Sequence, residues 1–94
     1  MEIRQEDRGS KGSFFVEEDG VRVAETTYSR AGDTTVIIDH TDVADHLRGT
    51  GAGRRLVEAA VAWARRDHLR IIPLCPFANS VFAKEPSLRD VLAT

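Results

Sequence analysis

The stretch Arg48-Gly49-Thr50-Gly51-Ala52-Gly53-Arg54-Arg55-Leu56 divides the sequence into a β-rich part and a helical part. Its three glycines at alternate positions let the backbone turn so that several N–H groups converge, and a helix is expected to begin beside them. Converging N–H groups and the positive end of a helix dipole favour an anion, above all phosphate. A turn needed only for geometry would not require this many glycines and arginines, so the stretch predicts a phosphate-binding loop.

The residues before this loop have the pattern of antiparallel strands. Asp19-Gly20 separates the β-rich runs 13–18 and 21–28, and such a junction is typical of a tight hairpin because both turn residues tolerate positive φ. The next run, 34–40, is rich in β-branched residues and fits a central strand buried on both faces. We therefore expect three strands in meander order, and residues 1–6 could add a short strand at the edge.

Helical periodicity begins where the loop ends. From Gly53 to about His68, apolar residues recur at spacings of three and four, which predicts an amphipathic helix of four turns packed on the sheet. Trp63 lies near the border of the apolar stripe and is expected in the core or at its rim. Residues 70–74 predict a short strand near a sheet edge, because its proline lacks a ladder donor. Short helical segments are expected at 79–84 and 88–92.

Length, charge and composition exclude several classes of protein. A chain of 94 residues with 41% hydrophobic and 30% charged side chains predicts one domain over residues 1–94. With a formal net charge of −2, the protein lacks the overall positive field that non-specific nucleic-acid binding requires. No apolar run approaches the ~20 residues that cross a bilayer. With one cysteine and a polar start without an apolar signal region, we expect neither disulfide nor export, and a cytoplasmic location.

The details of the loop decide between kinds of phosphate ligand. No Gly-Lys-Ser/Thr follows it, and Arg54 stands where the dinucleotide fingerprint has its third glycine, so neither ATP nor NAD is favoured. The stretch closely resembles the pyrophosphate-binding motif of the GCN5-related N-acetyltransferase superfamily. That motif is Gln/Arg-x-x-Gly-x-Gly/Ala, here Arg48-x-x-Gly51-x-Gly53.

Further segments resemble the very small single-domain YjdJ-type group of acetyltransferase-like proteins. They are His40-Thr41-Asp42-Val43, the segment Cys75-Pro76-Phe77-Ala78-Asn79-Ser80-Val81-Phe82, Pro86 and Asp90-Val91-Leu92. The resemblance covers roughly residues 12–92 and implies a minimal α/β (α+β) fold, with a mostly antiparallel sheet and one long helix after the loop. It implies acetyl-CoA as cosubstrate and an amine acceptor. This length leaves no room for the superfamily's N-terminal helical region and last strand pair, so the acceptor stays open.

The resemblance also implies which residues bind coenzyme A. The backbone of Val43 would pair with the pantetheine arm and direct an N–H at the thioester carbonyl, where it would stabilise a developing negative charge. Asn79 and Phe82 would close over the pantetheine, and Lys84 would reach a phosphate at the nucleotide end. The pyrophosphate would be held by Arg48, Gly49, Thr50, Gly51, Ala52, Gly53 and Arg54.

Two residues are candidates for catalysis. Cys75 follows the last predicted strand, where the resemblance places the acetyl group, and a thiolate is a natural nucleophile toward a thioester. His40 would favour that thiolate, or would itself act as the general base that deprotonates an amine. Lone cysteines are more often small buried hydrophobes, so a packing role for Cys75 stays open. The superfamily often uses a tyrosine acid near the chain end, whereas the single tyrosine here is Tyr28.

No metal site is expected, because the three histidines and Cys75 lack paired ligand spacing; His46 and His68 are expected to be ordinary surface or helix-end residues. Three function classes follow. The first is an acetyl-CoA-dependent N-acetyltransferase. The second is a non-catalytic CoA or acyl-CoA binding module, and the third is a protein-interaction domain with a vestigial loop and no CoA affinity. Acetyl-CoA turnover that depends on an amine separates the first from the second.

Overall fold

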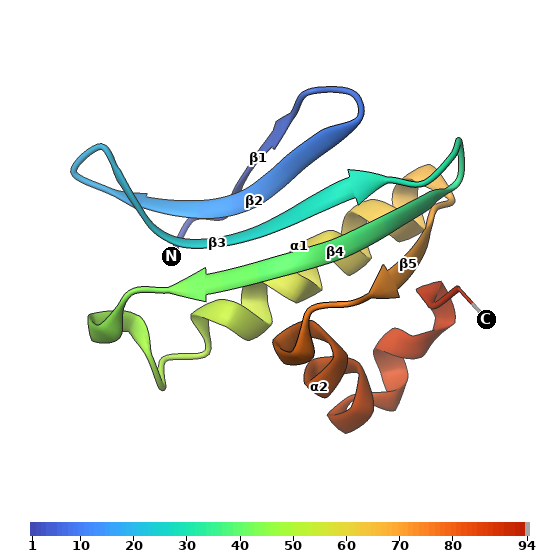
Figure 1. Ribbon diagram of the computed structural model, residues 1–94. Coiled ribbons are helices and arrows are strands. Elements are labelled where there is room, and N and C mark those ends of the chain that lie inside the picture. The colour runs from blue at the N-terminus through green and yellow to red at the C-terminus, as the bar shows by residue number, and fades with distance from the viewer. Residues whose placement is uncertain (94) are drawn as a thin grey trace.

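Five strands form one sheet in the order β1-β2-β3-β4-β5, and the long helix α1 packs across one face of it (Figure 1). The structure, a computed structural model, describes residues 1–93. The strands are β1 (Arg4–Asp7), β2 (Lys11–Glu18), β3 (Val21–Arg30), β4 (Thr35–Val43) and β5 (Arg70–Pro73). The helices are η1 (Asp45–Leu47), α1 (Ala52–Asp67), α2 (Pro76–Lys84) and η2 (Pro86–Val91), of which η1 and η2 are 3-10 helices. This is the mixed fold that the sequence predicts.

The strands before the loop are antiparallel and follow the predicted meander. Asp19 and Gly20 join β2 to β3 with φ values of 51° and 79°, as a tight hairpin requires. The short edge strand is present as β1. β5 lies parallel to β4 at the other side of the sheet, and its outer edge is covered where Leu92 bridges to Ile71.

β4 differs from its prediction in burial. Val36 and Ile38 are each 1% exposed, whereas Ile37 is half-buried and Asp39 and His40 are exposed. The expectation of a strand buried on both faces is therefore wrong. The reason is that, within residues 1–93, helices cover only the face of the sheet on which α1 lies.

Helix α1 supplies much of the apolar layer that packs against the sheet. Trp63 is buried, and its ring centroid lies 4.7 Å from that of Tyr28 and 5.7 Å from that of Phe14. The helix ends before His68, which adopts the left-handed conformation and donates its N–H to Ala64 O. Its 16 residues make it the longest helix among residues 1–93, and none of these helices is long and apolar enough to cross a membrane. The buried side chains of the predicted stripe are Leu56, Val57, Ala60, Val61 and Ala64.

Helix α2 begins earlier than the predicted segment over 79–84. Its first residue is Pro76, and proline is favoured there because its missing N–H would have no partner in the first turn. After α2, Pro86 begins η2, which replaces the predicted turn over 88–92. The helical segments thus exist where expected, with earlier starts.

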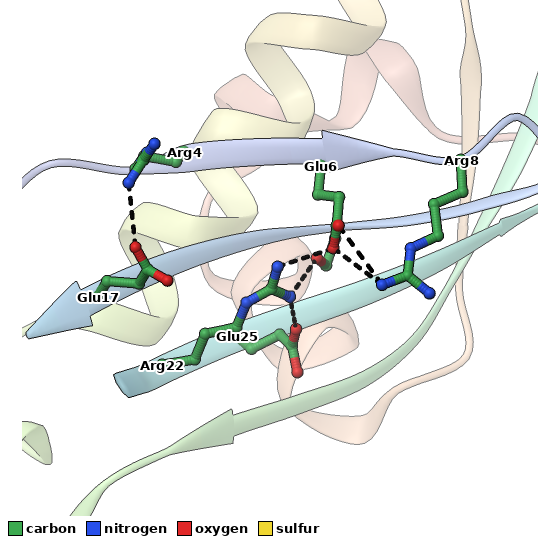
Figure 2. Close-up of polar contacts among 7 residues, drawn as sticks. Arg4, Glu6, Arg8, Glu17, Arg22 and Glu25 are labelled. Atoms are coloured by element: carbon green, nitrogen blue, oxygen red, sulfur yellow. Dashed lines mark hydrogen bonds and ion pairs between the residues drawn. The ribbon is translucent and has the colours of Figure 1, made fainter. Parts of the chain in front are cut away.

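Ion pairs lie over β1 to β3 on the face of the sheet opposite α1 (Figure 2). The Arg22 guanidinium lies 3.7 Å from the centre of the Phe15 ring and donates to Glu6 at 2.7 Å and Glu25 at 2.5 Å. Arg4 approaches the same ring at 6.0 Å. The hydrogen bond from Arg22 lowers the pKa of Glu6. Phe15 is consequently 6% exposed although it lies on the face without a helix.

The buried Tyr28 hydroxyl, which bonds to Asp7, is expected to make the free energy of unfolding fall at alkaline pH. The Tyr28 hydroxyl donates to Asp7 Oδ2 at 2.7 Å, and burial, followed by this bond, raises the pKa of Tyr28 to about 12. Because this pKa lies above the unfolded value of about 10, the stabilisation is complete below pH ~10 and is lost as pH rises through ~12. Urea denaturation should show the wild-type free energy of unfolding falling by on the order of 2 kcal/mol more than that of Tyr28→Phe across this interval. Parallel curves would contradict the expectation.

Candidate functional site

A groove of about 530 Å³ lies where β4 ends and α1 begins. Its walls are the end of β4, the segment from Leu47 to the first turn of α1, and the ring of Phe77 on α2. The ring is 41% exposed. Predicted cofactor residues among the lining are Val43, Arg48, Gly49, Gly51, Ala52, Gly53 and Arg54.

The loop presents unpaired backbone N–H groups to this groove. Gly49 and Gly51 have φ values of 81° and 86°, in the left-handed region that glycine tolerates best. Gly51 is the N-cap of α1 and offers no side-chain cap, and the first helical hydrogen bond runs from Arg55 N to Gly51 O at 3.0 Å. The amides of residues 52–54 therefore have no partner inside the helix and suit an anion. No acidic residue stands in the first turn to compete for them.

Close packing narrows the groove beside this helix end. A Cβ on Gly53 would lie 2.7 Å from Phe77 Cζ, which is closer than van der Waals contact allows. Thr50 does not line the groove, and its hydroxyl donates to Leu47 O at 2.5 Å. Glycine at position 53 thus lets α1 and α2 meet at one wall.

The two arginines of the groove differ in how far carboxylates neutralise them. Arg54 lies 3.2 Å from Glu58 and 2.6 Å from Glu85, and the hydrogen bond to Glu58, followed by Glu85, raises the Arg54 pKa. Arg48 lies 3.3 Å from Asp45, its side chain is 70% exposed, and its Nε donates to Val43 O at 3.4 Å. Arg48 is therefore the more available cation for an anionic ligand.

β4 and β5 separate beside the groove. Their pairing ends at Ile38 and Pro73, after which the N–H groups of Leu74 and Cys75 both donate to Ile38 O. β4 continues to Val43 alongside β3 alone. Because Ala44 N donates to Val23 O on β3, the preceding residue, Val43, directs its backbone groups to the opposite edge, which β5 has left. That edge provides an N–H for an extended ligand.

Cys75 lies just behind the groove. It is the N-cap residue of α2, it is 5% exposed, and its Sγ lies 3.4 Å from Thr41 Oγ1. Thr41 itself lines the groove. The sulfur is thus one side chain away from the space that an acyl group could occupy.

His40 does not accompany Cys75, so the predicted pairing of these residues is wrong. A β-bulge on β4 leaves Asp39 between the pairs Thr27–His40 and Tyr28–Ile38. After the bulge, Thr41 faces Cys75, and His40, as its neighbour in the strand, lies on the opposite face. Its side chain is exposed there.

α2 contributes a different aromatic residue from the one predicted. Phe82 is 1% exposed in the core and does not line the groove, so its assignment to the pantetheine wall is wrong. Phe77 lines the groove instead, because residues five apart on a helix point in different directions. Asn79 and Lys84 are exposed and lie outside the groove lining.

The remaining histidines lie at the surface or at a helix end. His46 Nε2 lies 2.7 Å from Glu18 Oε1, and His68 caps α1. Across residues 1–93, no three His, Cys, Asp or Glu side chains are grouped so that they could hold a metal ion.

The sequence of the groove and the core matches a known family. Residues 13–91 match the model of the GCN5-related N-acetyltransferase family. The chain belongs to this family. A candidate GCN5-like N-acetyltransferase from Staphylococcus aureus, known from its solution structure, is 36% identical with a TM-score of 0.75, over 98% of this chain and 87% of that protein. No curated protein sequence matches the chain.

Two N-acetyltransferases of lower sequence identity share the fold. The aminoglycoside N-acetyltransferase AAC(6')-Iy in complex with CoA is 16% identical with a TM-score of 0.63, and the match covers 88% of each chain. A ribosomal-protein-alanine N-acetyltransferase from Brucella melitensis is 16% identical with a TM-score of 0.68, over 94% of this chain and 64% of that protein. At this identity the two structures establish the arrangement of strands and helices alone.

Proposed function

We propose that the protein binds acetyl-CoA in the groove and transfers its acetyl group to an amine. The observation that carries the proposal is the uncapped start of α1 beside Gly49 and Gly51, which opens into the gap between β4 and β5. One end of this groove suits a pyrophosphate, and the other offers an extended backbone edge. A long ligand with phosphates at one end and an amide-containing arm fits both ends.

The residues that would hold each part of the ligand follow from their positions. Backbone amides of Gly49 and of residues 51–54 would hold the pyrophosphate, with Arg48 as the more available cation. Val43 would pair with the pantetheine arm, and the Phe77 ring would form the apolar wall that the sequence assigned to Phe82. Asn79 would close over the pantetheine from α2, and Lys84, farther along the helix, would reach a phosphate at the nucleotide end.

Cys75 would carry the acetyl group between the two substrates. Its thiolate would attack the thioester carbonyl carbon, the bond from that carbon to the CoA sulfur would break, and CoA would leave with the proton that Cys75 lost. The Val43 N–H would stabilise the oxyanion. An amine would then attack the acetyl-cysteine, and the product amide and the free thiol would result. The proton that the amine loses would pass to the departing sulfur of Cys75, because His40 lies exposed on the opposite face of the sheet, away from this site.

A non-catalytic CoA-binding module is the second candidate. The burial of Cys75, at 5% exposed, favours it, because a buried thiol that donates a hydrogen bond resembles a packing residue. In that case the groove would bind acetyl-CoA without consuming it.

Mass spectrometry of the protein with acetyl-CoA, under native and then denaturing conditions, tests the proposal. We expect a noncovalent CoA complex, and an acetyl adduct that an added amine discharges with release of CoA. A complex without adduct and without amine-dependent CoA release would leave the binding module. The absence of any complex would contradict both candidates.

A further inference from the structure

Three side chains form a chain of hydrogen bonds that leads from the groove into the sheet. Cys75 Sγ lies 3.4 Å from Thr41 Oγ1, which lies 2.9 Å from Thr26 Oγ1, which in turn lies 3.0 Å from the carbonyl oxygen of His40. Thr26 is 1% exposed and stands opposite Thr41 in the register of β3 and β4. The chain therefore lies away from bulk water, apart from the surface that Thr41 presents to the groove.

The number of available protons determines which group donates in each of these hydrogen bonds. A carbonyl oxygen can only accept, so the single hydroxyl proton of Thr26 lies on its bond to His40 O. The proton between the two threonines must then come from Thr41. Since Thr41 has only one proton, it accepts from the thiol of Cys75. Each of the three groups donates once, toward the backbone of β4.

Loss of the thiol proton would change the partner of Thr41. A thiolate can only accept, and within residues 1–93 the group at hydrogen-bonding distance from the sulfur is Thr41 Oγ1. Its proton would therefore turn from Thr26 to the sulfur. The charged side chains on the elements packed around Cys75 are not hydrogen-bonded to it within residues 1–93. They are Asp39, His40 and Asp42 on β4, Arg70 on β5, Arg54, Arg55, Glu58, Arg65, Arg66 and Asp67 on α1, and Lys84 on α2.

We propose that Thr41 is a positioning residue that donates its hydroxyl proton to the Cys75 thiolate, and that Thr26 competes with the sulfur for that proton. This inference rests on the proposed function, because it gives Cys75 the thiolate that acetyl transfer requires. A hydrogen bond to a charged acceptor is stronger than one between neutral groups, so the exchange of partners favours the thiolate.

The pH profile of Cys75 alkylation by iodoacetamide, followed by intact mass, tests the proposal without acetyl-CoA. Thr41→Val removes the donor and is expected to move the midpoint of the profile upward by about one pH unit. Thr41→Ser should restore it, and Thr41→Ala should repeat the shift if valine perturbs the fold. Thr26→Val removes the competing acceptor and is expected to move the midpoint downward. Thr35→Val, on β4 but not part of these hydrogen bonds, is the matched control. Cys75→Ala, which has no thiol to alkylate, gives the background signal.

Opposite shifts for the two threonine variants support the proposal. An unchanged midpoint in Thr41→Val overturns it, and so does an upward shift in Thr26→Val, which would indicate a general loss of packing. The outcome is separable from that of acetyl transfer. If the midpoints shift as expected but no acetyl adduct forms, Thr41 acts on the sulfur as inferred and the proposed covalent transfer fails.

Discussion

Gly51→Glu is expected to abolish acetyl-CoA binding while the sheet stays folded. Gly51 has a φ of 86°, and a Cβ built there meets no atom within 4 Å, so the new side chain has room. A non-glycine residue at this φ costs about 1 kcal/mol, which a folded domain tolerates. The glutamate would place its carboxylate where the amides of residues 52–54 are expected to hold the pyrophosphate. Isothermal titration calorimetry should show an affinity loss of at least about 100-fold.

The matched control for this variant is Gly51→Gln. It has the same shape and the same backbone strain as glutamate but no charge, so we expect it to retain part of the affinity. Equal losses in both variants would show that backbone conformation alone explains the effect. Unchanged affinity in Gly51→Glu would place the phosphates elsewhere and would contradict the proposed role of the loop.

Cys75→Ala is expected to remove acetyl transfer and leave acetyl-CoA binding close to wild type. The side chain does not line the groove, so its loss removes no contact from the proposed binding surface. Loss of a catalytic nucleophile lowers turnover by about 100-fold or more. The small cavity left by the buried sulfur should cost about 1 kcal/mol of stability. Amine-dependent release of CoA and calorimetric titration measure the two effects separately.

Cys75→Ser serves as the companion variant. It keeps the volume and the hydrogen bond to Thr41 but replaces the thiol with a much weaker nucleophile. We expect wild-type stability together with greatly reduced transfer. Turnover at the wild-type rate in both variants would eliminate the nucleophile role and favour direct attack of the amine on the bound thioester.

The local order of the chain follows from short-range signals. The Asp19-Gly20 turn and the spacing of apolar residues in α1 each depend on neighbours within a few positions, and both are observed as predicted. The segment over residues 48–53 lies at the start of α1 for the same reason. Glycine is the residue that best tolerates positive φ, so the glycines of this segment indicate a turn from the sequence alone.

The partner of Cys75 depends on a feature that no short-range signal gives. Alternation along 34–40 would place His40 on the same face as Val36 and Ile38, and the bulge at Asp39 reverses this. The bulge is set by pairing with β3, which is a long-range contact. Thr41 was therefore missed as the neighbour of the sulfur.

The aromatic wall could have been found in the sequence. Pro76 favours the first position of a helix, and with a start at 76 the apolar residues Ala78, Val81 and Phe82 share one face. Phe77 then falls outside that stripe and is available to the groove. The predicted start at 79 concealed this arrangement.

The bridge between Leu92 and Ile71 has a consequence for how the protein behaves in concentrated solution. Ala93 N donates to Ile71 O at 2.9 Å, so residues 92 and 93 occupy backbone groups on the outer side of β5. An uncovered strand of that kind is a template for intermolecular β-pairing and fibrillar aggregation. Residues 92 and 93 thus cover this edge of the sheet against such pairing, on the same β5 that, farther along, turns away from β4 to open the groove.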